Sequence, residues 1–225
     1  MENIFILNIE TATKACSVSL SKNGELLCIE EELSEKYIHS ERLTTFIDKI
    51  FTYSKITFKD LNAIAVSKGP GSFTGLRIGV STAKGLCYGL DIPLIAINTL
   101  DSLCANFLHN NQLLENEVLV PMIDARRREV YTLIKDKYSN IIDTSAIEIT
   151  SEFFYKLDNY NKIHLLGDGC NKFKKEFSSE KIEYHIHISC SAASMVESSY
   201  RKFKNKKFED LACFEPYYLK DFKAF

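Results

Sequence analysis

The chain has 225 residues, of which 45% are hydrophobic, so it can bury a full-sized core in one large domain or two small lobes. Its 28 basic and 30 acidic residues give a formal net charge of −2. This composition excludes a disordered chain and a protein whose whole surface binds nucleic acid or membranes, so any contact with RNA must be local.

The cysteines and the first residues indicate where the protein works. Seven cysteines occur, an odd number with no Cys-x-x-Cys pair, which argues against a disulfide framework or a zinc knuckle. The opening stretch MENIFILNIET has an apolar run of only four residues before Asn8, too short for a signal peptide or a membrane span. We therefore expect a cytoplasmic protein with reduced, mostly buried thiols and no membrane contact.

The first half of the chain predicts three strands and then alternating helices and strands. Successive strands are predicted for IFILNIET, ACSVSLSKNG and ELLCIEEE, with Asn23-Gly24 as the hairpin turn between the last two. An amphipathic helix is predicted for HSERLTTFIDKIF, with Ser40 as its N-cap. A strand, a glycine-bearing helix, a strand and a helix then follow at residues 61–69, 72–89, 93–98 and 100–108.

The second half repeats this order. Strands are predicted at 117–125, 128–136, 141–149, 162–169 and 183–188, and helices at 151–157, 171–177 and 191–203. Both halves are βββαβαβα, and the polar stretch HNNQLLENE connects them. We expect an α/β fold of two lobes, residues 1–108 and 117–225, each with a mixed sheet flanked by helices. The last helix and tail can pack back on the first lobe.

Two carboxylates occupy matched places in the repeat. Glu10 and Asp124 each end the first strand of a half, where a pair of carboxylates can hold a magnesium ion or an attacking water. A carboxylate at such a turn can equally cap nearby backbone N–H groups, and the residues alone leave the two interpretations even. With Thr11 and Arg126 beside them, they define a candidate vestigial cleft.

The turn before the glycine-bearing helix can be a phosphate loop or a tight turn. Backbone N–H groups of Gly69-Pro70-Gly71-Ser72 would lie at a helix N-terminus, where anions bind. However, the glycines are spaced G-x-G-x-x-x-G, which matches neither the P-loop nor the dinucleotide fingerprint. A strand-to-helix turn that requires positive φ is therefore favoured.

The histidines predict no metal site. A site on the first helix would need a second histidine one turn after His39, and that position is Leu43. His185 and His187 are predicted to share one face of a strand, with no third ligand evident. Since no nucleophile motif is present either, we assign neither a metal ligand nor a catalytic residue.

Gly75 and Gly79 lie one turn apart in a predicted helix, where each costs about 0.8–1 kcal/mol relative to Ala. On a helical wheel they form a stripe with Thr82 and Leu86, beside the core face. Removing two Cβ atoms lets a neighbouring helix approach closer than the usual ~8–10 Å. That neighbour is either the helix of residues 43–51 in the same lobe or a partner chain, and the pattern slightly favours the same lobe.

Three stretches resemble one known family. ILNIETATKACSVSL, GPGSFTGLRIGVSTAKGL with NTLDSL, and MIDARRREVY are similar to the TsaB (YeaZ) family of bacterial tRNA threonylcarbamoyladenosine biosynthesis proteins. The match runs from the first strand to at least Tyr131, and beyond it only the order of elements agrees. The resemblance implies a Gcp-like domain with the two-lobed actin-like, Hsp70-like (RNase H-like) fold of the ASKHA superfamily.

The resemblance also implies a role. TsaB-like proteins support a catalytic subunit, TsaD, and a small P-loop ATPase, TsaE, in placing a threonylcarbamoyl group on adenosine 37 of tRNAs that read codons beginning with A. The catalytic relative carries a His-x-x-x-His metal motif, of which only His39 is present here, and its adenine loop is not recognisable. We therefore expect a non-catalytic subunit without a tightly bound cofactor, which meets ATP, Mg²⁺ and tRNA through the complex and forms a homodimer when alone.

Family resemblance places the subunit contact on the first two helices. The interface predicted there comprises His39, Leu43, Phe46, Ile47, Ser72, Phe73, Gly75, Leu76, Gly79 and Thr82. On this interpretation, Gly79→Leu blocks the partner while the chain stays folded.

Two alternatives remain open at this point. Arg126, Arg127 and Arg128 match a family signature and either bind an anion or brace the hairpin after Asp124, with bracing favoured. The alternative function is a nucleotide-dependent phosphotransferase of the sugar-kinase superfamily that uses Glu10 and Asp124.

Overall fold

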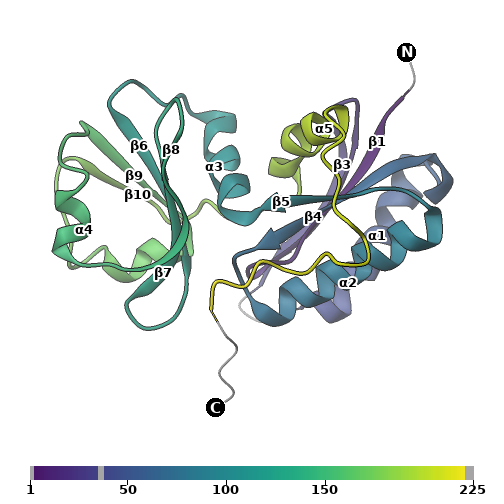
Figure 1. The fold of residues 1–225 in the computed structure, drawn as a ribbon, viewed down its shortest axis with the longest axis horizontal. Coiled ribbons are helices and arrows are strands. Elements are labelled where there is room, and N and C mark those ends of the chain that lie inside the picture. The colour runs from purple at the N-terminus through teal and green to yellow at the C-terminus, as the bar shows by residue number, and fades with distance from the viewer. Residues whose placement is uncertain (1–2, 35–37, 221–225) are drawn as a thin grey trace. The chain divides into compact units, whose positions relative to one another are not determined.

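The computed structural model describes residues 3–34 and 38–220, and the chain divides into two compact units (Figure 1). The first unit combines the described residues up to Ser102 with Cys190–Tyr218. The second combines Leu103–Ser189 with Leu219 and Lys220. This division differs from simple halves at 1–108 and 117–225, because the last helix packs on the sheet of the first unit.

The first unit is built on a five-stranded mixed sheet. Its strand order is β3-β2-β1-β4-β5, with β1 and β2 and then β2 and β3 antiparallel, and the pairs β1–β4 and β4–β5 parallel. Both turn residues between β2 and β3 have positive φ, 54° at Asn23 and 85° at Gly24, which confirms the predicted hairpin. The strands are β1 (Phe5–Glu10), β2 (Ala15–Lys22), β3 (Glu25–Leu33), β4 (Leu61–Gly69) and β5 (Leu94–Asn98).

Helices cover both faces of this sheet. On one face, α1 (His39–Ser54) and α2 (Phe73–Leu90) bury Leu7 and Ile9; on the other, α5 (Val196–Lys204) and a 3-10 turn (Ala193–Met195) bury Ile6 (Figure 1). A further 3-10 turn spans Phe58–Asp60. The predicted N-cap at Ser40 is wrong, because α1 already begins at His39 and leaves Ser40 inside the first turn.

The segment before α5 is hydrogen-bonded to β2. The Ala192 N–H donates to Ser17 Oγ at 2.9 Å, and the Ser19 hydroxyl donates to the Ala192 carbonyl at 2.9 Å. The Ser191 hydroxyl donates to Glu31 Oε2 at 2.7 Å. Residues late in the sequence thereby satisfy polar side chains on the α5 face of the first sheet.

The second unit repeats the topology with strand order β10-β9-β6-β7-β8. Its strands are β6 (Glu117–Asp124), β7 (Glu129–Lys135), β8 (Asn140–Glu148), β9 (Lys162–Leu166) and β10 (Ile182–His185), and its helical elements are α4 (Ser151–Tyr155), a 3-10 helix (Asp168–Phe173) and the end of α3 (Thr99–Asn110). Two five-stranded mixed sheets flanked by helices confirm the predicted α/β class and the internal repeat.

Two predictions for this unit are wrong. The helix expected at 171–177 does not form, because the 3-10 helix ends at Phe173. The Phe177 carbonyl, at the end of the predicted helix, instead accepts a hydrogen bond from the Tyr184 hydroxyl at 2.6 Å. β10 ends at His185, so His187 lies in the following turn and not on a strand face.

Among the helices that the structure describes, none is long and apolar enough to cross a membrane.

Candidate functional site

Glu10 is fully buried at the end of β1. Its Oε1 accepts hydrogen bonds from the Ala12 N–H at 2.6 Å and from the Ser67 hydroxyl at 2.9 Å. Burial raises the pKa of Glu10 from 4.5 to about 7, although both hydrogen bonds act to lower it. Its Oε2 has no hydrogen-bond partner within residues 3–34 and 38–220. The carboxyl therefore acts as a buried cap of the β1–β2 turn.

Asp124 makes the equivalent cap at the end of β6. Its Oδ1 accepts a hydrogen bond from the Arg126 N–H at 2.8 Å and forms an ion pair with Lys172 Nζ at 2.6 Å. Arg126 and Arg127 have positive φ, 70° and 50°, and so form the turn itself. The two carboxylates that the repeat aligned thus perform the same structural task, a hydrogen bond to the backbone two residues later.

Arg128 braces the hairpin, as expected. Its guanidinium donates to both carboxylate oxygens of Glu176, at 3.0 and 2.8 Å, and to the Ile149 carbonyl at 3.1 Å. The fork of donors on the guanidinium suits this bidentate contact. Through these bonds, the side chain ties β7 to the segment that follows the 3-10 helix of the second unit.

The glycine-rich turn is a close approach of two backbones. Gly69 has φ 111°, and a Cβ on Gly71 would collide with the Ala12 carbonyl oxygen. The same oxygen accepts a hydrogen bond from the Ser72 N–H at 2.6 Å. Gly167, with φ 94°, holds the matching place in the second unit. These contacts favour the structural turn over a phosphate loop.

Gly75 and Gly79 make room for Thr11. A Cβ on Gly75 would collide with the Thr11 carbonyl oxygen, and a Cβ on Gly79 with Thr11 Oγ1. The Thr11 hydroxyl donates to the Gly75 carbonyl at 2.8 Å. The neighbour of the glycine stripe is thus the β1–β2 turn of the same unit, together with the His39 ring at 3.1 Å from the added Cβ on Gly75. This contact argues against the expectation that Gly79→Leu leaves the chain folded, because the leucine would occupy the space of Thr11.

Most of the residues predicted for the partner interface are buried within the first unit. The buried members are His39, Leu43, Phe46, Ile47, Gly75, Leu76 and Gly79, whereas Ser72, Phe73 and Thr82 are partly exposed. His39 Nε2 lies 2.8 Å from the Thr13 carbonyl oxygen, and burial lowers the pKa of His39. The buried side chains position the two helices within the first unit.

The exposed side of α1 and α2 carries a different set of residues. We define the outward helix surface as the exposed residues Glu41, Arg42, Thr44, Thr45 and Asp48 of α1 and Thr74, Ser81, Gly85, Tyr88 and Gly89 of α2. A Cβ added at Gly85 or at Gly89 would meet no atom within 4 Å. Tyr88 is 84% exposed, so a large aromatic ring lies next to the two glycines, which have no side chain.

The C-terminal segment holds one flank of α2 (Figure 1). Lys84 Nζ donates to the carbonyl oxygens of Ala212 at 3.3 Å and Phe214 at 2.9 Å. Arg77 Nε donates to the Tyr218 hydroxyl at 3.2 Å. The polar side chains of Arg77 and Lys84 are therefore used inside the unit, which leaves the outward helix surface beside them.

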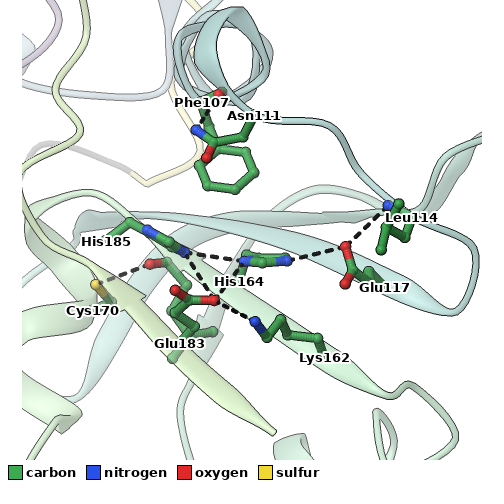
Figure 2. A network of polar contacts seen from close by, with 10 residues as sticks. Phe107, Asn111, Leu114, Glu117, Lys162, His164, Cys170, Glu183 and His185 are labelled. Atoms are coloured by element: carbon green, nitrogen blue, oxygen red, sulfur yellow. Dashed lines mark hydrogen bonds and ion pairs between the residues drawn. The ribbon is translucent and has the colours of Figure 1, made fainter.

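A second cluster of polar groups lies on the second unit (Figure 2). His164 of β9 lies near His185 and Glu183 of β10, and the ligand atoms of these three residues are all within 4.8 Å of one another. The sequence interpretation missed this group because His164 and His185 lie 21 residues apart. The available signal was the alternation in KIHLL and in EYHIH, which places a histidine on one face of each strand.

A family model described as "TsaD: tRNA N6-adenosine threonylcarbamoyltransferase" matches residues 32–224. The chain is also similar to proteins named "tRNA threonylcarbamoyladenosine biosynthesis protein TsaB". The Haemophilus influenzae protein is 36% identical over 154 residues, which are 68% of this chain and 61% of that protein. The Escherichia coli protein is 38% identical over 131 residues, 56% of this chain and 52% of that protein.

The similarity extends further along other relatives. TsaB of Buchnera aphidicola subsp. Schizaphis graminum is 31% identical over 194 residues, which are 80% of this chain and 87% of that protein. The solved structure of YeaZ from Pseudomonas aeruginosa superimposes with a TM-score of 0.80 at 21% identity, over 96% of this chain and 100% of that chain. This superposition confirms the two-lobed actin-like fold implied by the resemblance. The match to the Haemophilus and Escherichia proteins spans between half and two thirds of their length.

Proposed function

Because the chain belongs to the TsaB proteins, within the family described as TsaD, we propose that it is a subunit for tRNA threonylcarbamoyladenosine biosynthesis. It would support a TsaD-like catalytic partner and a TsaE-like P-loop ATPase in threonylcarbamoylation of adenosine 37 in tRNAs that read codons beginning with A. The observation that carries the proposal is the 31% identity over 87% of the Buchnera protein, whose name gives this pathway.

The geometry of the two turn carboxylates supports a non-catalytic role. Glu10 is buried and caps Ala12, and Asp124 is held by Lys172. A phosphotransferase that used this pair would have to break both arrangements, so the alternative function gains no support. We propose that the chain binds no cofactor tightly and meets ATP, Mg²⁺ and tRNA through the complex, in the cytoplasm.

The outward helix surface is our candidate for the contact with the catalytic partner. It replaces the buried residues of the sequence prediction while keeping the same two helices. Small residues on the exposed side of α2 allow a partner helix to approach closely, and Tyr88 supplies a large aromatic contact beside them. In the absence of that partner, the same surface is the candidate for self-association.

The pathway assignment is tested by depleting the protein in its host and measuring threonylcarbamoyladenosine in hydrolysed tRNA by mass spectrometry. We expect the modified nucleoside to fall, and to return when the gene is restored. An unchanged level would refute the assignment.

The non-catalytic role is tested by calorimetry of the isolated chain with ATP and Mg²⁺. Turnover of ATP that is lost in Glu10→Ala would contradict this role.

The interface is tested with Gly85→Leu. This change adds bulk to the outward helix surface, and leucine is a better helix former than glycine, so the isolated chain should remain folded. We expect loss of co-purification with a TsaD-like subunit. Ser178→Leu is the matched control, since Ser178 is exposed on the second unit. Equal co-purification of the two variants would refute the interface.

A further inference from the structure

The second unit carries three side chains of types that can bind metals on one face of its sheet. The parallel register places Glu183 of β10 directly opposite His164 of β9. His185 follows Glu183 by two residues and so points to the same face. On β6, the residue opposite His164 is Leu119, and Glu117 lies two residues before it on that face. Side chains from three adjacent strands thus lie close together on one face of the sheet, and no loop residue takes part.

The distances match a shared cation. His164 Nδ1 lies 3.1 Å from His185 Nε2, and Glu183 Oε2 lies 3.6 Å from the first nitrogen and 3.9 Å from the second. Two nitrogens at that separation, each at about 2.0–2.1 Å from a zinc ion, would subtend roughly 95–102° at the metal. That angle lies between octahedral and tetrahedral values. We propose that His164, His185 and Glu183 bind a divalent transition-metal cation, with Zn²⁺ the best fit.

The chemistry of the ligands suits this role. Lys162 Nζ lies 3.0 Å from Glu183 Oε2, so this carboxylate already pairs with a cation in the structure. Imidazole ligands favour zinc and its neighbours over Mg²⁺ or Ca²⁺, which prefer oxygen.

A second carboxylate orients one of the ligands (Figure 2). His164 Nε2 lies 3.4 Å from Glu117 Oε2, which also accepts a hydrogen bond from the Leu114 N–H at 3.0 Å. A proton on Nε2 shared with Glu117 leaves the Nδ1 lone pair for the metal. This arrangement of carboxylate, histidine and metal is usual around zinc.

The surroundings allow entry from one side. The Phe107 ring of α3 packs 5.1 Å from the His164 ring and 4.8 Å from the His185 ring, which shields that side from water. The Glu183 side chain is 45% exposed, so a cation can enter there and keep a water as its fourth ligand. Bound metal would join the four-residue edge strand β10 to its neighbour β9.

The test is calorimetric titration of the full chain with Zn²⁺ after removal of metals by a chelator. We expect one equivalent to bind, together with a rise in the thermal midpoint. Glu117→Gln should weaken binding by about 10–100-fold, the usual effect of losing such an orienting carboxylate. His185→Gln should abolish the saturable binding. His109→Gln is the matched control, because His109 is exposed and outside the cluster.

Two further variants distinguish binding at this cluster from binding elsewhere on the chain. Cys213→Ser removes the exposed thiol and should leave the titration unchanged. Lys162→Met removes the ammonium that competes for Glu183, so zinc should bind more tightly. Absence of saturable binding by the folded wild type, or binding that His185→Gln leaves intact, would overturn the proposal. Weaker binding in Lys162→Met would also contradict it, because the ammonium and a cation held by Glu183 repel each other and compete for the same oxygen.

Discussion

The buried carboxyl of Glu10 should make the stability of the protein depend on pH. In the folded chain the pKa of Glu10 is about 7, against 4.5 for the unfolded reference. Below pH 4.5 the group is protonated in both states, and its contribution to stability is fully present. As the pH rises through the folded pKa, the charge is forced into a buried site and that contribution is lost. With about 1.4 kcal/mol per pKa unit, the total loss is about 3 kcal/mol, of which about 2–3 kcal/mol falls between about pH 5 and pH 8.

Glu10→Gln removes this ionisation. The amide oxygen can still accept the hydrogen bonds from Ala12 and Ser67, so the turn keeps its cap. We expect urea unfolding, followed by circular dichroism, to show that the variant gains about 2–3 kcal/mol relative to wild type between about pH 5 and pH 8. Because other titrating groups are common to both proteins, the difference between the two curves isolates Glu10. Parallel curves across this range would refute the reasoning, as would a Glu10 carboxyl that titrates near pH 4.5 by NMR.

Two further predictions follow from the packing. Gly79→Ala should destabilise the chain by about 1–3 kcal/mol in urea unfolding, because its Cβ collides with Thr11 Oγ1. In the double variant with Thr11→Ala the loss should be smaller than the sum of the single losses, and strict additivity would contradict the contact. Mass spectrometry of the native protein should show fast alkylation at Cys213, the exposed cysteine. Burial raises the pKa of Cys16 and Cys87 to about 12, so rapid labelling there would count against the described core.

The elements that sequence analysis predicted well are those defined by local pattern. β4 spans Leu61–Gly69 as predicted, because LNAIAVSKG is a short apolar run bounded by turn residues. The Asn23-Gly24 hairpin and the repeated strand order rest on the same kind of information, namely turn chemistry and spacing. The repeat predicted two lobes, and the family resemblance added that their fold is actin-like, which a sequence pattern does not specify.

The parts that failed depend on contacts between distant segments. A helical wheel shows that Gly75 and Gly79 share a face, but it does not show that Thr11, 64 residues from Gly75, fills the space beside them. The wheel likewise did not show that most of the predicted interface residues are buried, since the burial of Leu43 and Leu76 follows from packing onto the sheet. Choosing between capping and metal binding at Glu10 and Asp124 also required the positions of Ser67 and Lys172.

The same limit applies to the histidine cluster. The sequence shows no third ligand for His185, because its partners are set by strand pairing and not by spacing along the chain. Parallel pairing of β9 with β10 brings His164 beside Glu183, although no motif connects KIHLL with EYHIH. A sequence search restricted to closely spaced ligands therefore cannot find a group of side chains that is distributed over two strands.

The placement of Cys190–Tyr218 in the first unit has a consequence for how the protein is made. During synthesis the β1–β5 sheet leaves the ribosome before the second unit, yet the segment that is hydrogen-bonded to Ser17 and Ser19 emerges after that unit. Until then the face of Ile6 has no cover, and the nascent first unit must wait for the second to be translated. A fragment ending before residue 190 would therefore expose an incomplete core, so studies of partner binding need the whole chain.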